Sequence, residues 1–177
     1  PVSNAYYASG VSRLPQLLTA GVRVGIGVDG ASTNNSQNVW ESMKMAMLFQ
    51  KQHLEQASFG SAELALELMT RGGAAALHMQ DQIGSLEAGK YADLIVIDID
   101  RPALAPAQTI ISNLVYSNDP WAVRDVYVDG RLVVSNGQHA TLRSDAVIRN
   151  ARSALAGVLA RSGLDDYLSK RSRWNWN

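Results

Sequence analysis

The chain has no cysteine, only three histidines, no net charge and no long apolar run, and each absence excludes a class of function. Without cysteine there can be no disulfide and no thiolate metal ligand, which fits a reducing compartment, and we expect a cytoplasmic location. The 16 basic and 16 acidic residues cancel, which argues against nucleic acid or an anionic membrane surface as the main partner. No apolar stretch approaches the ~18 residues that a membrane-spanning helix needs.

The three histidines, His53, His78 and His139, are too scattered to form a metal site by themselves. No two of them stand two or four residues apart, the spacings that place two imidazoles on one face of a strand or helix. His53 is expected at a helix end, where positive charge suits the helix dipole, and the other two are expected at the surface. We expect none of them to bind metal.

The length of 177 residues and the hydrophobic share of 46% suffice for one globular domain, or for two small pieces of larger ones. The chain opens Pro1-Val-Ser-Asn4, with neither Met nor a leader. We therefore expect a piece of a longer protein.

The most informative segment is Gly21-Val-Arg-Val-Gly-Ile-Gly-Val-Asp-Gly-Ala-Ser-Thr-Asn-Asn35. Its apolar run predicts a parallel strand over residues 22–28, covered on both faces, followed by a polar loop. The strand ends on Asp29, and carboxyl ends of strands are where catalytic groups collect in α/β proteins. On the residues alone, Asp29 is either a metal-binding or proton-transferring carboxylate or the first residue of an Asp-Gly turn.

Helices are predicted on both sides of this strand. Leu14, Leu17 and Leu18 have helical spacing and Gly21 is placed as a stop. Further helices are predicted from a Ser36 cap to about His53, after a Ser61 cap, and over residues 73–79. Strand, polar loop and helices in this order are typical of a (β/α) barrel or a doubly wound sheet.

The pattern changes near Ile83. Residues 92–98 predict a strand, and residues 123–128 and 131–135 predict a hairpin closed by Asp129-Gly130. An amphipathic helix opened by Ser144-Asp145 follows. We expect three parts: residues 1–82, residues 83–143 and a helical tail over residues 144–177.

Three segments in order resemble the metal-dependent amidohydrolase superfamily, in its cytosine-deaminase-like branch of guanine, 8-oxoguanine and S-adenosylhomocysteine deaminases and triazine hydrolases. Pro1-Val-Ser-Asn4 is similar to the end of that family's His-x-Pro-x-Ser-Asn motif, and Gly27-Val-Asp29-Gly to its eighth-strand motif. Ile83-Gly-Ser-Leu-Glu-Ala-Gly-Lys-Tyr-Ala-Asp-Leu-Ile-Val-Ile-Asp98 is similar to the return from its barrel to its β-sandwich, and Val128-Asp-Gly-Arg-Leu-Val-Val134 extends the likeness. The resemblance covers residues 1 to about 160.

The resemblance implies an α/β fold: the C-terminal part of a (β/α)8 TIM barrel over residues 1–82, then part of a small β-sandwich over residues 83–143. It implies a hydrolase acting on a C–N or C–Cl bond of a nitrogen heterocycle. In that family Asp29 would be both metal ligand and catalytic proton acceptor, with zinc as the expected metal and iron as the other candidate. The metal histidines and the catalytic glutamate would lie upstream, so we expect the isolated chain to be inactive. Its expected partners are the N-terminal half of the same protein and further copies of it.

Other interpretations remain open. The chain could be a non-catalytic piece that only packs against a partner, whereas a sugar- or nucleotide-binding module would need a phosphate-binding loop that the sequence lacks. Four polar residues near the predicted barrel mouth could bind substrate or could cap turns and helices: Asn4, Ser32, Asn34 and Asn35. No residue can be assigned to substrate recognition from the sequence.

Overall fold

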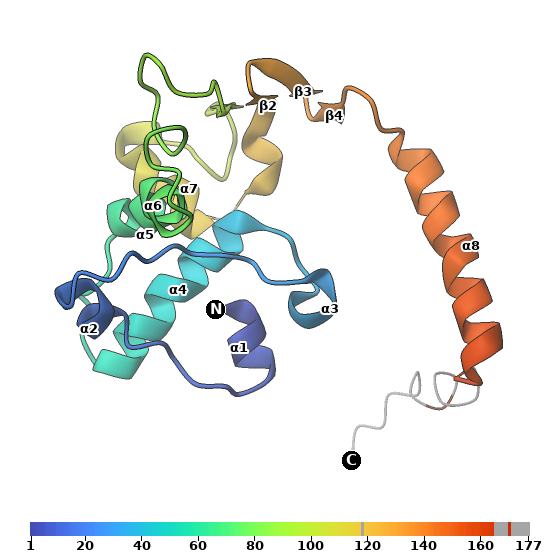
Figure 1. Cartoon of the computed structure of the whole chain (residues 1–177), viewed down its shortest axis with the longest axis horizontal. Coiled ribbons are helices and arrows are strands. Elements are labelled where there is room, and N and C mark those ends of the chain that lie inside the picture. Colours follow the sequence, from blue (N-terminus) through green and yellow to red (C-terminus); the bar gives the residue numbers. More distant parts are fainter. Residues whose placement is uncertain (118, 165–169, 171–177) are drawn as a thin grey trace. The chain divides into compact units, whose positions relative to one another are not determined.

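The computed structural model describes residues 1–117, 119–164 and 170, and the chain forms two compact units (Figure 1). The first unit is Pro1–Gly137 and the second is Gln138–Asn177. Each is described by itself.

Helices make up most of the first unit. They are α1 (Val2–Tyr6), α2 (Leu14–Thr19), α3 (Ala31–Asn34), α4 (Val39–Leu54), α5 (Ala62–Met69), α6 (Arg71–Ala76) and α7 (Ile110–Ser117), with 3-10 turns at Ala107–Thr109 and Pro120–Ala122. Helices α4, α5 and α7 pack on one another. Their buried side chains form the core together with one residue of α2: Leu14, Trp40, Met43, Met47, Ala62, Ala65, Leu68 and Val115.

Two predicted helix caps had different outcomes. Ser61 caps α5 as predicted, because its hydroxyl accepts a hydrogen bond of 3.2 Å from the Leu64 N–H. The Ser36 cap was wrong: α4 is capped by Asn38, whose Oδ1 accepts from the Trp40 N–H at 3.0 Å. The Ser36 hydroxyl instead accepts from the Asn38 N–H at 3.1 Å, so it shapes the turn that precedes the helix.

The remaining helix predictions were partly confirmed. Helix α2 ends at Thr19, and Gly21 follows with the positive φ of 71° that a helix stop requires. Helix α6 begins at Arg71 and ends at Ala76, earlier than the predicted 73–79, because His78 takes a left-handed conformation. Helices α1 and α7 were not predicted.

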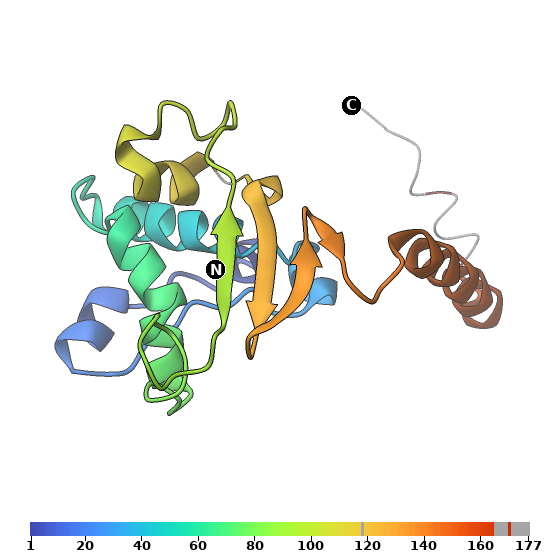
Figure 2. The same cartoon turned by 90° about the horizontal axis from the view of Figure 1, so that it is seen from above.

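The predicted small antiparallel unit is confirmed. Strand β1 (Leu94–Ile97) pairs with β2 (Val123–Val128), which pairs with β3 (Arg131–Ser135), and Figure 2 shows the three side by side. The Asp129-Gly130 turn has positive φ at both residues, 50° and 72°, as a two-residue hairpin turn requires. Ile97 and Val123 pack against the helical core, so the sheet shares one hydrophobic core with the helices.

Residues 22–28 form no strand, and that prediction was wrong for this chain. The segment is a plain tube between α2 and α3 in Figure 1, and its alternation survives: Val24, Ile26 and Val28 are half-buried, whereas Gly25 and Gly27 are exposed. A strand is defined by a hydrogen-bonded neighbour, and no other strand lies beside this segment in the described part of the chain. The segment therefore keeps the alternating burial of a strand but lacks the hydrogen bonds to a neighbouring strand.

In the second unit, a two-residue strand β4 (Gln138–His139) precedes helix α8 (Ser144–Ser162), which begins where predicted. No residue of α8 is buried, and its apolar side chains Val147, Ile148, Leu155 and Val158 are all exposed. Among the described residues, no helix combines the length and apolar character needed to cross a membrane. The Trp174–Asn177 end of the predicted tail lies outside the described residues.

Candidate functional site

Asp29 lies where the extended segment 22–28 ends and the loop to α3 begins. Its backbone has a φ of 67°, a left-handed conformation that is uncommon outside glycine. The Gly30 N–H donates a hydrogen bond of 2.6 Å to the Asp29 Oδ1. The side chain is exposed, so the rest of its coordination capacity is available to a ligand.

The backbone on both sides of Asp29 is fixed by side chains of the following loop. Asn34 Nδ2 donates to the Val28 carbonyl at 2.6 Å, and Gln37 Nε2 donates to the Asp29 carbonyl at 3.1 Å. The Thr33 hydroxyl donates to the Gly30 carbonyl at 2.8 Å. These bonds tie the loop to the end of the extended segment, and the carboxylate is thereby held in one place.

Hydrogen bonds keep the Asp29 carboxylate ionised. The Gly30 N–H first, and the Ser3 hydroxyl next, hold the pKa of Asp29 below its ordinary value. A carboxylate with a lowered pKa is a ready ligand for a cation at neutral pH. It is also a weaker proton acceptor than an unperturbed aspartate, so the shift favours the ligand role over the basic one.

Ser3 is the site residue that sequence reasoning missed. It lies on α1 and is buried, and only the fold brings it to Asp29, which is far along the chain. The available signal was its place inside Pro1-Val-Ser-Asn4, one of the three segments that carry the family resemblance.

The four polar residues singled out at the predicted barrel mouth do not form one cluster. Asn34 is buried and holds the loop, while Asn35 ends α3 with a φ of 61°. Asn4 donates to the Gly10 carbonyl at 3.5 Å, and Ser32 is exposed. Turn formation and helix termination account for Asn34 and Asn35.

Neither histidine of the first unit joins Asp29. His53 is exposed near the end of α4, His139 belongs to the second unit, and His78 Nδ1 lies 2.8 Å from Arg23 Nη1. Among the residues that the structure describes, no group of three or more His, Asp or Glu side chains could hold a metal ion. The donor set thus fits a metal only in part: Asp29 can be one ligand, and the others would have to come from elsewhere.

A cavity of about 200 Å³ lies beside the extended segment. Its lining comes from five stretches of the first unit: Pro1 and Asn4, Gly10–Leu14 without Arg13, Val24–Gly27, Ala46, Phe49 and Gln50 of α4, and Leu68 of α5. Gln50 is 3% exposed, and its Nε2 donates to the Ser12 carbonyl at 2.8 Å. The Gln50 Oε1 is buried without a donor.

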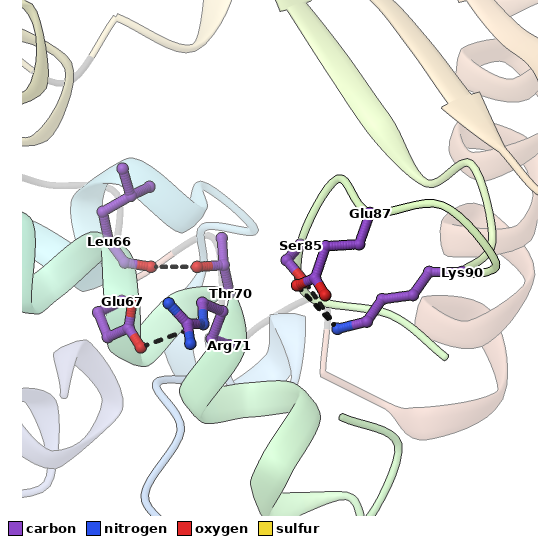
Figure 3. Close-up of polar contacts among 7 residues, drawn as sticks. All are labelled: Leu66, Glu67, Thr70, Arg71, Ser85, Glu87 and Lys90. Carbon is purple, nitrogen blue, oxygen red and sulfur yellow. Dashed lines mark hydrogen bonds and ion pairs between the residues drawn. The ribbon is translucent and has the colours of Figure 1, made fainter. Parts of the chain in front are cut away.

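A second polar cluster lies where α5 and α6 meet the loop before β1 (Figure 3). The Lys90 ammonium donates to the Ser85 hydroxyl at 2.7 Å and lies 3.3 Å from Glu87 Oε1, and the Ser85 hydroxyl donates to the same carboxylate at 2.5 Å. Arg71 faces Glu67 at 3.6 Å across one helical turn. Every charged group here has a partner, so we interpret the cluster as the internal bracing of the loop Gly84–Lys90.

Comparison with known proteins gives the following similarities. Residues 1–133 match the amidohydrolase family. The chain is 42% identical over 151 residues to a 5-methylthioadenosine/S-adenosylhomocysteine deaminase of Desulforudis audaxviator, covering 85% of this chain and 35% of the relative. It is 38% identical over 168 residues to an S-triazine hydrolase of Gordonia rubripertincta, and this match covers 93% of this chain and 35% of the relative.

Among solved structures, the chain is similar to an adenosine deaminase from Xanthomonas campestris with bound zinc. The TM-score is 0.83 at 32% identity, and the match covers 86% of this chain and 35% of that protein. The chain thus spans about a third of the length of each of these relatives.

Proposed function

Because this chain belongs to the amidohydrolase family, we propose that it is the C-terminal part of a metal-dependent hydrolase that cleaves a C–N or C–Cl bond of a nitrogen heterocycle. One observation carries the proposal: an exposed, ionised carboxylate is held in fixed geometry at the end of the extended segment, within the region that matches the family. The relatives named as deaminases and as a triazine hydrolase support the substrate class.

Asp29 is the residue to which we assign the chemistry. A divalent metal, most simply the zinc of the Xanthomonas campestris structure, would supply Lewis acidity and lower the pKa of the attacking water. The Asp29 carboxylate would be one ligand, and it would then take the proton of the water. It would pass this proton to a leaving nitrogen, whereas chloride would leave as the anion and the proton would go to solvent. The hydrogen bonds from Gly30 and Ser3 favour the ionised form of the carboxylate, in which it would bind the metal and await the proton.

The fold assignment follows from the same membership. We infer that residues 22–28, which form no strand in this chain, would become a barrel strand beside neighbours from the rest of the protein, and that residues 1–82 are the end of a TIM barrel. Residues 83–143 would contribute to a β-sandwich and residues 144–177 would form a helical tail. The N-terminal half of the same protein is the required partner, because a catalytic zinc takes three or more protein ligands and the described residues offer one.

The competing proposal is a piece that binds a partner and catalyses nothing. It is favoured by the donor set, since the described residues contain no group of three or more side chains that could hold a metal ion. The two proposals differ in what they predict for a completed protein.

The test is a chimera in which this chain replaces the matching 151 residues of the Desulforudis audaxviator deaminase. Zinc content after dialysis and deamination of S-adenosylhomocysteine are then measured. The proposal predicts bound zinc and turnover in the chimera and neither in the isolated chain. A chimera that folds and binds zinc but deaminates neither S-adenosylhomocysteine nor adenosine, and hydrolyses no triazine, would favour the non-catalytic alternative.

A further inference from the structure

A pocket of about 430 Å³ lies where α5 and α6 meet the loop before β1, among the side chains drawn in Figure 3. Its volume falls within the roughly 300–1,000 Å³ of small-molecule sites. Its wall includes Gly72, where a Cβ would lie 2.5 Å from the Val24 carbonyl oxygen. Val24 precedes Asp29 by five residues of extended chain, which span about 16 Å. The pocket is therefore separate from the candidate metal ligand.

The charges on the wall of this pocket balance. Glu67 and Glu87 contribute two carboxylates, and the wall also contains two cations, Arg71 and Lys90. The Ser85 hydroxyl is the main cause that lowers the pKa of Glu87, and the positive charge of Arg71 adds to this effect. A ligand with a single charge therefore meets a like charge in this pocket, whereas a ligand with both charges can find a partner for each.

The two charges on the loop side are already committed to each other. The Lys90 ammonium lies 3.3 Å from the Glu87 carboxylate and donates to the Ser85 hydroxyl at 2.7 Å. The Lys90 side chain is only 15% exposed. This side of the pocket is therefore a braced wall that offers a ligand little free bonding capacity.

The two charges on the helix side keep free bonding capacity. Arg71 Nε lies 3.6 Å from Glu67 Oε1, and both side chains are more than half exposed, at 67% and 52%. In the described part of the chain, the two Nη atoms of Arg71 donate to no protein acceptor. A guanidinium presents a planar fork of N–H groups, which binds a carboxylate through two parallel hydrogen bonds. Arg71 thus has an open carboxylate-binding edge next to the Glu67 carboxylate.

We propose that this pocket binds a small zwitterion, an α-amino acid with a compact apolar side chain. The carboxylate of the amino acid binds the Arg71 guanidinium, and its ammonium binds the Glu67 carboxylate. Its side chain lies against Ala75 and Ile83, which form the apolar part of the wall. An exposed ion pair such as Glu67–Arg71 stabilises a protein little, so the ligand can compete for both partners. The site takes no part in the reaction assigned to Asp29, and the proposal goes beyond the proposed function.

Protein-observed NMR tests the proposal by titration of the isolated chain with L-valine. The shift changes should be confined to the amides of residues 67–90, with a dissociation constant of about 1 mM, as expected for a ligand of this size. If self-association broadens the spectrum, the titration is carried out on the chimera, which contains the same pocket. A folded protein that shows no binding at about 50 mM L-valine would overturn the proposal.

Two analogues of L-valine, each lacking one charge, test the need for a zwitterion. Isovalerate lacks the ammonium, and L-valinamide lacks the carboxylate. Each should bind at least about 10-fold more weakly than L-valine, because each leaves one charged group of the pocket without its partner. Isovalerate or inorganic phosphate that binds as tightly as L-valine would show a simple anion site and would overturn the proposal. Equally tight binding of L-valinamide would show a cation site and would also overturn it.

Two substitutions identify the partners of the two ends of the ligand. Arg71→Gln should weaken the binding of L-valine at least about 10-fold, whereas Glu67→Gln should weaken the binding of L-valine but not of isovalerate. Arg152→Gln is the matched control and should change neither affinity, because Arg152 is exposed in the second unit. Unchanged binding of L-valine by Arg71→Gln, in a variant whose circular dichroism matches the wild type, would overturn the site.

Discussion

The side-chain amide of Asn34 donates a hydrogen bond of 2.6 Å to the backbone carbonyl of Val28, the residue before the candidate metal ligand Asp29. Asn34 is 1% exposed, so this bond is made inside the protein and couples the end of α3 to the end of the extended segment. Among the contacts described above, this bond acts on the backbone immediately before Asp29 and helps to fix the position of that residue.

Asn34→Ala should therefore destabilise the isolated chain by about 1–3 kcal/mol, because the partly buried Val28 carbonyl loses its donor. Ser32→Ala is the control on the same short helix, since Ser32 is exposed. Urea denaturation of the three proteins measures the effect. A loss in Asn34→Ala no larger than in Ser32→Ala would show that the bond contributes nothing.

Two adjacent glycines of α6 should respond oppositely to alanine. A Cβ on Gly72 would lie 2.5 Å from the Val24 carbonyl oxygen, whereas the nearest atom to a Cβ on Gly73 is 3.7 Å away. Gly72→Ala should cost about 1–3 kcal/mol through overpacking of backbone against backbone. Gly73→Ala should be neutral or stabilising by up to about 1 kcal/mol, because alanine suits a helix better than glycine. Thermal melts of both variants measure the change in melting temperature. Equal changes for Gly72→Ala and Gly73→Ala would contradict the close packing of residues 22–28 on α6.

The Ser85–Glu87–Lys90 cluster should show a defined pH dependence. The Ser85 hydroxyl first, and the Lys90 ammonium next, hold the pKa of Glu87 below its ordinary value of 4.5. The stabilisation from these contacts is fully present above the unfolded-state pKa and is lost as the pH falls through the lower folded-state pKa.

An NMR titration of the Glu87 carboxyl checks this. Ser85→Ala should raise the Glu87 pKa toward 4.5, whereas Ser58→Ala, at an exposed position elsewhere, should leave it unchanged. A Glu87 pKa that is the same in wild type and Ser85→Ala would remove the hydroxyl as the cause.

The isolated chain should retain no stoichiometric zinc after dialysis, since the described residues contain no group of three or more side chains that could hold a metal ion. Its unpaired edge and exposed apolar residues should also promote association. Elemental analysis measures the zinc content, and light scattering measures the mass in solution. A dialysed monomer with one equivalent of zinc would mean that the chain holds a complete site by itself.

Local chemistry explains what the sequence could predict. The hairpin of β2 and β3 was predicted with its bounds because the Asp129-Gly130 turn and the alternating valines encode it within a few residues. The Ser61 cap is equally local. The Ser36 cap failed by two residues, since Asn38 is an equally good cap and the sequence does not say which of them begins the helix.

Non-local partners explain what the sequence could not predict. The alternation in residues 22–28 was apparent, but a strand also needs a neighbour, and no local pattern shows whether one is present. Asp29 was found because it ends an apolar run. The approach of Ser3 to Asp29 depends on the packing of α1, which was not predicted, and so this donor was missed.

The most direct test of the central claim is Asp29→Ala in the chimera with the Desulforudis audaxviator deaminase, measured as kcat and as zinc per protein. Asp100→Ala is the control, because it removes another exposed aspartate outside the site. The account predicts that Asp29→Ala lowers kcat by at least about 100-fold and reduces bound zinc while the melting temperature is nearly unchanged. Retention of more than about a tenth of the chimera's kcat would contradict the assignment of the chemistry to Asp29.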